Sequence, residues 1–270
     1  SERQVIEALS AAAVRQNRTH QIILMVDMGD LREGVWFTHF EEIVEKVNLI
    51  NALPHLELYG LGTNFNCYGT VLPTVKNGED FLAIAAKVEE RCGIKINYLS
   101  AGNCTSYHLL DKGIWPKGLN HLRIGGLHEF GIEYVDMKYL DEFNHSSKPV
   151  DKACSDIYKL YAEVIELNSK PTVPVGELGV DAFLQSKTFE DNGTRKRALL
   201  AFGRQDVPSE NCIPVDDNIQ VLGQTSDHTI IDIEDVKNNL KVGDVICFEL
   251  DYTGLLMASQ TNGVQKRYVR

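Results

Sequence analysis

Small, polar and glycine residues gather at four places in the first 130 residues, each directly after an apolar run. The four segments are 27–34 (DMGDLREG), 60–69 (GLGTNFNCYG), 100–106 (SAGNCTS) and 122–126 (LRIGG). Glycines, hydroxyls and free N–H groups in the last two suit a phosphate, although a helix N-cap explains residues 102–106 equally well. Arg123 lies inside an apolar run, so its guanidinium needs an acceptor, either a structural carboxylate or a ligand.

The hydrophobic pattern predicts that these four segments meet. Apolar runs near residues 22, 57, 96 and 122 predict strands, and helical spacing between them predicts helices. This alternation is typical of parallel strands joined by crossovers, whose carboxyl ends gather ligands. After about residue 150, short apolar runs alternate with Gly, Pro and Asp-Asn turns, which predicts an antiparallel sheet. We therefore predict an α/β domain over residues 1–150 and an all-β domain over 151–270.

The composition narrows the class of protein. The 270 residues include 27 Lys and Arg and 38 Asp and Glu, which gives a formal charge of −11. The sequence has no block of basic residues, so it argues against a nucleic-acid-binding protein. The longest apolar run, residues 21–26, is too short to span a membrane. Six cysteines without C-x-x-C or finger spacing favour reduced thiols in a cytoplasmic protein, not a disulfide framework or a metal site.

In their order along the chain, these segments resemble alanine-racemase-like enzymes, and the ornithine racemase branch in particular. The segments that carry the resemblance are 25–34, 62–64, Asn103 with its hydroxyl neighbours, 122–125, 181–183, 195–198, 203–206 and 226–228. The resemblance implies a pyridoxal-phosphate (PLP) enzyme built from a (β/α)8 barrel and a C-terminal β-domain. Residues 1–150 would supply barrel strands 5 to 8. The implied activity is racemisation of an amino acid by α-proton exchange in a homodimer.

The resemblance also implies cofactor-binding residues. Arg123 would hydrogen-bond the pyridine nitrogen of PLP, Arg32 would approach its phenolic oxygen, and Asn64 would pack against the ring face. By itself, Arg32 reads more readily as a surface ion pair. The phosphate and its surroundings would be contacted by Asn103, Cys104, Thr105, Gly125, Gly126 and, from the β-domain, Tyr252.

The chain also departs from the family pattern. The family's PLP lysine lies at the end of the first barrel strand, and the resemblance here begins at strand 5. Because residue 1 also opens inside a helical pattern, we expect an N-terminally truncated chain that is inactive alone. The family's catalytic tyrosine aligns near Val175, and Cys104 and Gly126 replace Ser and Glu of the ornithine racemase branch.

The identity of the second catalytic base stays open. The candidates are Cys67, His228 and an Asp227–His228 pair, yet Cys67 reads equally well as a packed thiol and His228 as a structural histidine. Asp227 also falls where the β-domain reaches the neighbouring subunit's active site. Two other functions fit less of the sequence: a metal-assisted PLP-dependent D-amino-acid lyase, suggested by residues 226–228, and a non-catalytic PLP-binding relative. The residues do not decide which amino acid is the substrate.

Overall fold

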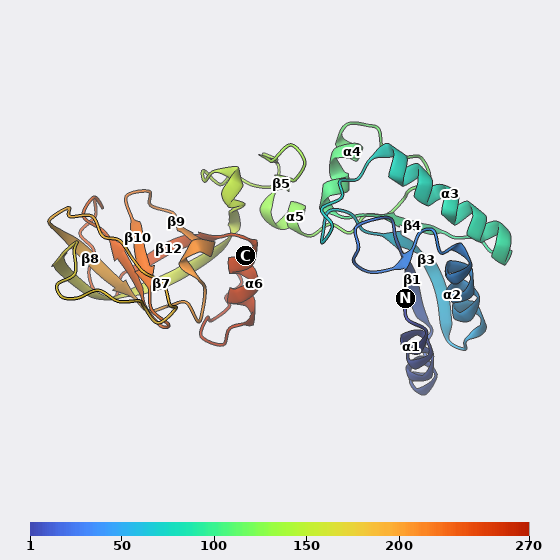
Figure 1. The fold of residues 1–270 in the computed structure, drawn as a ribbon, viewed down its shortest axis with the longest axis horizontal. Coiled ribbons are helices and arrows are strands. Elements are labelled where there is room, and N and C mark those ends of the chain that lie inside the picture. Colours follow the sequence, from blue (N-terminus) through green and yellow to red (C-terminus); the bar gives the residue numbers. More distant parts are fainter. Residues whose placement is uncertain (270) are drawn as a thin grey trace. The chain divides into compact units, whose positions relative to one another are not determined.

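The computed structural model describes residues 1–269, which form two compact units (Figure 1). The first unit comprises residues 1–128 and 133–138, and the second comprises 129–132 and 139–270. Each unit has its own hydrophobic core. The predicted domains 1–150 and 151–270 stay a prediction. Among residues 1–269, no helix combines the length and the apolar character that crossing a membrane requires.

A four-stranded parallel sheet forms the centre of the first unit, in the order β2-β1-β3-β4. The strands are β1 (His20–Asp27), β2 (Val35–Trp36), β3 (Leu56–Thr63) and β4 (Tyr98–Ala101). Gly62 of β3 pairs with Met25 of β1 and with Ser100 of β4, so the three strands end side by side. The helices of this unit are α1 (Arg3–Gln16), α2 (Phe40–Ala52), α3 (Val75–Cys92) and α4 (Tyr107–Asp111), with a 3-10 turn η1 (Cys104–Ser106). Three short elements have residues in both units: α5 (Gly126–Phe130), β5 (Ile132–Glu133) and β6 (Lys138–Tyr139).

The core of this unit lies between one face of the sheet and three helices. Strand residues Leu24 and Leu61 pack there with Ile6 of α1, Ile43 of α2 and Phe81 of α3. Helical spacing of the apolar residues explains why these helices dock on the sheet. The other sheet face has no such cover among the described residues. It carries half-buried side chains, including Ile23, Met25 and Tyr98.

Helix α3 begins four residues before the predicted start at Glu79. The Thr74 hydroxyl accepts the N–H of Asn77 at 3.2 Å, and the Asn77 side chain accepts the N–H of Thr74 at 2.8 Å. This reciprocal cap starts the helix in a polar stretch that the hydrophobic period does not mark. The helix ends at Gly93, whose φ of 64° favours glycine.

The third and fourth predicted strands differ from the structure. The strand predicted over 94–99 begins at Tyr98, because the Ile96 N–H is bound by the Glu89 carboxylate of α3 at 2.7 Å. The strand predicted near residue 122 is only a parallel bridge between Ser100 and His121. The Arg123 N–H still donates to the Gly102 carbonyl at 3.2 Å. The apolar run before the glycines is too short to extend this ladder.

The second unit contains a six-stranded antiparallel sheet in the order β10-β11-β8-β7-β12-β9. Its elements are η2 (Val150–Lys152), β7 (Ser155–Pro171), β8 (Thr194–Leu200), η3 (Ser209–Asn211), β9 (Cys212–Pro214), β10 (Gln220–Gln224), β11 (Thr229–Asp232), β12 (Val245–Leu250) and α6 (Tyr252–Gln260). Helix α6 was not predicted; it begins where the Asp251 carboxylate accepts the N–H of Gly254 at 2.7 Å. The predicted sequence of a parallel α/β region and an antiparallel β region is confirmed.

Candidate functional site

A hydrogen-bond network joins the loops that follow β3 and β4, and Asn103 is its centre. Its side-chain NH2 group lies 2.7 Å from the Phe65 carbonyl, 3.2 Å from Asn64 Oδ1 and 3.2 Å from Cys67 Sγ. Its oxygen accepts the Thr105 N–H at 3.0 Å and the Thr105 hydroxyl at 2.8 Å. The Asn103 side chain therefore brings Asn64, Cys67 and Thr105 together, and all four residues are predicted site residues.

Asp30 fixes the position of the loop that carries Cys67. Its buried carboxylate accepts N–H groups from Cys67 at 3.1 Å, Tyr68 at 3.2 Å and Val71 at 3.4 Å. Asn66 has a φ of 51°, a backbone conformation that is unfavourable for most residues other than glycine. The contacts to Asp30 hold the loop in this conformation, with the Cys67 side chain exposed beside Asn103.

Glu33 connects Arg32 to the network. Arg32 forms an ion pair with Glu33, with Nη2 3.0 Å from Oε1, and this contact raises the pKa of Arg32. Asn64 donates to the same Glu33 oxygen at 3.3 Å. Arg32 thus forms an exposed ion pair that lies one hydrogen bond away from Asn64, and its predicted contact with the cofactor stays a prediction.

Arg123 has hydrogen-bond acceptors but no carboxylate partner. Its Nη1 donates to the Ser100 hydroxyl at 2.5 Å and its Nη2 to the Thr63 carbonyl at 3.0 Å. Among the described residues, no Asp or Glu forms an ion pair with it. Burial lowers the pKa of the guanidinium, and the more distant charge of Glu33 offsets part of this effect. Its positive charge is therefore balanced by no carboxylate among the described residues, and its two acceptors are uncharged.

Backbone N–H groups converge on Cys104. Its sulfur accepts the N–H groups of Gly125 and Leu127, both at 3.3 Å. A Cβ at Gly125 would meet nothing within 4 Å, so open space adjoins this position. A Cβ at Gly126 would lie 2.5 Å from the Tyr134 hydroxyl, so a larger residue there would displace the end of the Tyr134 side chain. The predicted phosphate-binding segments therefore meet in the first unit.

The remaining predicted site residues belong to the second unit. In the turn between β10 and β11, the Asp227 carboxylate accepts the hydroxyls of Thr225 at 3.1 Å and Ser226 at 3.2 Å, and these bonds lower its pKa. Its Oδ1 lies 3.5 Å from His228 Nδ1. Tyr252 is exposed at the start of α6.

Sequence reasoning did not select Asp30, Glu33 or Ser100 as site residues. Asp30 and Glu33 lie in a segment that carries the family resemblance, but their partners Cys67 and Asn64 are more than 30 residues away. No local spacing could therefore identify these contacts. In the part of the chain that the structure describes, no three His, Cys, Asp or Glu residues come together in a group that could hold a metal ion.

The parallel α/β unit followed by an antiparallel sheet is similar to part of the alanine racemase fold. The family profile "Alanine racemase, N-terminal domain" matches residues 1–128. The ornithine racemase of Acetoanaerobium sticklandii is 36% identical over 266 residues, which cover 98% of this chain and 72% of that protein. The lysine racemase of Thermotoga maritima is 37% identical over 268 residues, 99% of this chain and 71% of that protein. The chain belongs to the alanine racemase family.

Solved structures show the same fold. The alanine racemase of Clostridium difficile 630 superposes with a TM-score of 0.60 at 20% identity, over 92% of this chain. This chain spans 60% of that structure's length. The alanine racemase of Bartonella henselae, solved with covalently bound pyridoxal phosphate, gives a TM-score of 0.60 at 14% identity over 98% of this chain and 71% of its own.

The residues present fit part of PLP. The unpaired charge of Arg123, the open space at Gly125 and a buried Ser106 hydroxyl without a partner among the described groups suit a phosphorylated ring. The lysine that would anchor PLP covalently has no counterpart in the strand-end segments. None of the strand-end segments 28–34, 64–74, 102–106 and 121–126 contains a lysine. The first unit therefore offers non-covalent contacts for PLP and lacks the lysine at its strand ends.

Proposed function

We propose that this chain provides the non-covalent cofactor site of a PLP-dependent amino-acid racemase with a diamino-acid substrate. The observation that carries this proposal is Arg123, a half-buried cation at the strand ends with no carboxylate partner in the described chain. The family supports the chemistry, because relatives over nearly the whole chain are an ornithine racemase and a lysine racemase. In this proposal, residues 1–150 correspond to barrel strands 5 to 8 and 151–270 to the β-domain.

When bound, PLP withdraws electrons from the substrate so that its α-proton becomes acidic. Arg123 would donate a hydrogen bond to the ring nitrogen. Thr105 and the backbone of Gly125 and Gly126 would hold the phosphate. Asn103 would position these groups, since it already fixes Thr105.

One proton-transfer group would come from this chain. Cys67 is favoured over His228 by its contact with Asn103, because that contact places the thiol in the same network as the cofactor residues. In one direction the Cys67 thiolate would accept the α-proton at Sγ from one face, and a second group on the opposite face would donate a proton to the α-carbon. In the reverse direction the Cys67 thiol would donate the proton and the second group would accept it. Replacing Cys67 with Ala should abolish α-proton exchange by the active enzyme, and unchanged exchange would assign the step to another group.

The substrate class is supported by charge. Asp227 is exposed, and its hydroxyl contacts lower its pKa, so the carboxylate is charged at neutral pH and complements a cationic side chain. We propose that the enzyme is a homodimer in which this turn faces the partner's site. In the active enzyme, Asp227→Asn should reduce ornithine turnover at least tenfold more than alanine turnover. Equal losses would remove Asp227 from substrate recognition.

Binding of pyridoxine 5′-phosphate tests the cofactor site on the 270-residue chain itself. This analogue has the ring and the phosphate of PLP but no aldehyde, so it cannot react with surface lysines. We expect saturable binding in equilibrium dialysis, weakened at least tenfold by Arg123→Leu, because one charge-assisted hydrogen bond contributes roughly 1.5–3 kcal/mol.

Arg91→Leu is the matched control for this experiment. Arg91 is an exposed arginine of the same unit that pairs with Glu41 between α3 and α2, away from the strand ends. The Arg91→Leu substitution should leave the affinity for pyridoxine 5′-phosphate unchanged. Equal affinities of the Arg123 and Arg91 variants, or no saturable binding at millimolar analogue, would contradict the proposed cofactor site.

A further inference from the structure

The Ser100 hydroxyl lies between the side chains of Arg123 and His121. Ser100 Oγ is 2.5 Å from Arg123 Nη1 and 3.0 Å from His121 Nδ1. A parallel bridge also pairs the backbones of Ser100 and His121, so these two residues are direct neighbours on adjacent segments. Ser100 is fully buried, whereas Arg123 and His121 are half-buried. A histidine that plays no part in the proposed cofactor contacts therefore reaches Arg123 through one serine.

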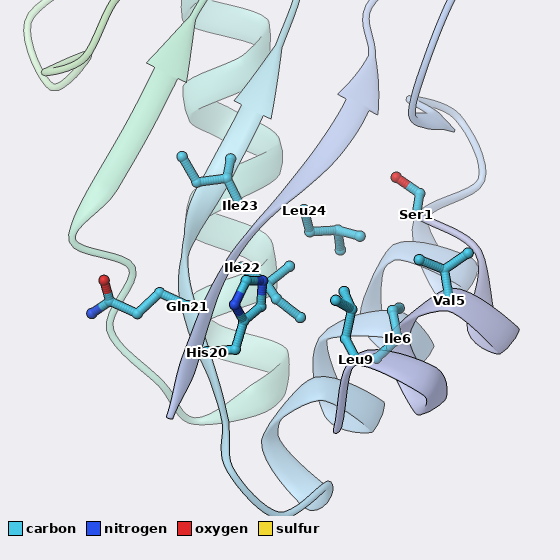
Figure 2. A pocket seen from close by; sticks show the side chains of 9 residues that line it. All are labelled: Ser1, Val5, Ile6, Leu9, His20, Gln21, Ile22, Ile23 and Leu24. Atoms are coloured by element: carbon cyan, nitrogen blue, oxygen red, sulfur yellow. The ribbon is translucent and has the colours of Figure 1, made fainter. Parts of the chain in front are cut away.

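Ser100 belongs to the sheet face that points away from helix α1. Met25 of β1, Gly62 of β3 and Ser100 of β4 pair in register, so their Cβ positions project to one face. Ile23 lies two residues before Met25 and shares this face. Figure 2 shows Ile23 pointing away from α1, whereas Leu24 points toward it. The Ser100 hydroxyl is thus separated by the sheet from the helical core and lies at the strand ends.

The segment that carries His121 is held in place although it forms no regular strand. The Asn120 side chain accepts the Leu99 N–H at 2.9 Å and donates to the Asn97 carbonyl at 2.7 Å. The His121 ring lies edge-on to the Tyr98 ring, with the centroids 6.2 Å apart. These contacts fix the imidazole against β4, so its distance to Ser100 does not depend on a flexible loop.

The chemistry of the three side chains determines where their protons lie. A guanidinium only donates, so Ser100 Oγ accepts from Arg123. Among the described residues, His121 Nδ1 is the other partner of this oxygen. If Nδ1 carried a proton, both neighbours would donate to Oγ, and the buried hydroxyl hydrogen would have no acceptor. Every group is satisfied when Ser100 donates to an unprotonated Nδ1, which places the imidazole proton on Nε2.

The same contacts orient the guanidinium of Arg123. Its Nη1 is bound to Ser100 of β4, and its Nη2 is bound to the Thr63 carbonyl of β3 at 3.0 Å. A guanidinium carries five N–H groups in one rigid plane, so fixing two of them fixes the direction of the other three. Those three have no acceptor among the described residues. A Ser100 hydroxyl that donates to His121 keeps its lone pairs, and not its hydrogen, toward Arg123.

We propose that His121 is a positioning residue for Arg123. Its Nδ1 accepts the Ser100 hydroxyl proton, and the serine oxygen in turn holds the guanidinium in the orientation in which it would donate to the ring nitrogen of PLP. His121 acts through Ser100 and does not touch the ligand. The identity of the ligand rests on the proposed function, whereas the chain of hydrogen bonds from His121 to Arg123 belongs to the protein alone.

Nitrogen NMR of the 270-residue chain tests the hydrogen bonds without a ligand. In mildly alkaline buffer we expect His121 Nδ1 to be unprotonated and to accept a hydrogen bond. Ser100→Ala should shift the Nδ1 signal toward that of an imidazole nitrogen without a hydrogen bond. Rotation of the Arg123 guanidinium about its Nε–Cζ bond should be slow in the wild-type chain. A protonated Nδ1, or an Nδ1 signal that is the same in wild type and Ser100→Ala, would overturn the proposal.

Two substitutions of His121 separate its acceptor from its bulk. Leu and Asn are similar in size, but only Asn places an oxygen where Nδ1 lies and can accept the Ser100 proton. In equilibrium dialysis with pyridoxine 5′-phosphate, His121→Leu should weaken binding about fivefold, the effect of one neutral hydrogen bond. His121→Asn should stay within about twofold of wild type. Equal affinities of the two variants would contradict a role for the acceptor.

A double substitution shows whether His121 acts through Arg123. In an Arg123→Leu background there is no guanidinium to position, so His121→Leu should cause no further loss of affinity. Thermal melting of each variant verifies that it folds. A further fivefold loss in this background would mean that His121 supports the site by another route and would overturn the proposal.

Guanidinium rotation separates this inference from the proposed function. If rotation is faster in His121→Leu and slow in His121→Asn, but pyridoxine 5′-phosphate does not bind the wild-type chain, His121 positions Arg123 and the proposed cofactor site fails. If the analogue binds through Arg123 and the Leu and Asn variants of His121 rotate and bind alike, the cofactor site stands and the inference fails.

Discussion

Arg123 of the first unit and Arg195 of the second have opposite electrostatic surroundings. Arg195 lies on the antiparallel sheet, where it contacts Asp232 at 2.6 Å and Asp235 at 2.7 Å, and these carboxylates raise its pKa. Arg123 contacts one hydroxyl and one carbonyl, and burial lowers its pKa. Arg195 thus has two carboxylate partners within its own unit, whereas Arg123 has no carboxylate partner among the described residues.

The cysteines of the two units differ in the same way. Cys154 and Cys212 are buried, and burial raises the pKa of each thiol to about 12. Cys67 is exposed at the strand ends and accepts a hydrogen bond from Asn103. Cys154 and Cys212 are therefore shielded from solvent, whereas the Cys67 thiol at the strand ends is exposed to it.

The largest expected effect is in thiol reactivity. At pH 8 a thiol of pKa about 12 is ionised in roughly one molecule in 10⁴, and burial blocks the reagent as well. Iodoacetamide should therefore alkylate Cys67 at least a hundred times faster than Cys154 or Cys212, as measured by peptide mass spectrometry. The same digest in urea, where all thiols should react at similar rates, is the control. Comparable rates in the native chain would remove the distinction between the units.

The next largest expected effect is the loss of stability when Asp232, a partner of Arg195, is removed. Asp232 is almost fully buried and accepts two bonds from Arg195 and one from the Glu234 N–H. Asp232→Ala should lower the free energy of unfolding by about 2 kcal/mol, because Arg195 Nε and the Glu234 N–H lose this acceptor, while Arg195 Nη2 keeps Asp235. Urea denaturation measures this change. Asp80→Ala, which breaks an exposed helix pair with Lys76, should cost far less.

The contribution of Asp232 to the free energy of unfolding should also depend on pH. Burial alone would raise its pKa, but the bonds from Arg195 and the Glu234 N–H outweigh this and lower it below 3.8. A lowered folded-state pKa gives stability that is present above the unfolded pKa and lost as pH falls through the folded one. The stability difference between the wild-type chain and Asp232→Asn should therefore be constant from pH 6 to 8 and shrink below about pH 4. A difference that is unchanged at pH 3 would contradict the ion pair.

Arg123→Leu should have the smallest effect on stability. The substitution removes two hydrogen bonds to neutral acceptors and leaves no carboxylate unpaired, so we expect the free energy of unfolding to change by less than about 1 kcal/mol. Urea denaturation alongside Asp232→Ala makes the comparison direct. A loss as large as that of Asp232→Ala would make Arg123 a structural residue like Arg195.

Much of the fold could be predicted because it follows from periodic patterns. The continuous apolar run at residues 21–26 identified β1, and the run at 245–250 identified β12 with its bounds. The pattern was less useful where a single side chain redirected the backbone. Glu89 delays the start of β4, and the Thr74–Asn77 cap starts α3 early. Such contacts depend on individual hydrogen bonds, which leave no mark on hydrophobic periodicity.

The sequence by itself determined which residues gather at the strand ends, because parallel strands joined by crossovers bring their carboxyl ends to one edge. It also determined that no lysine follows these strands. Only the tertiary structure decided that Arg32 pairs with Glu33, that Arg123 has no carboxylate partner among residues 1–269, and that Asp30 and Asn103 hold the Cys67 loop. Only the tertiary structure showed that Ser100 joins Arg123 to His121. The physical reason is distance along the chain: local patterns set strands and helices, whereas these contacts join groups that come together only when the sheet has formed.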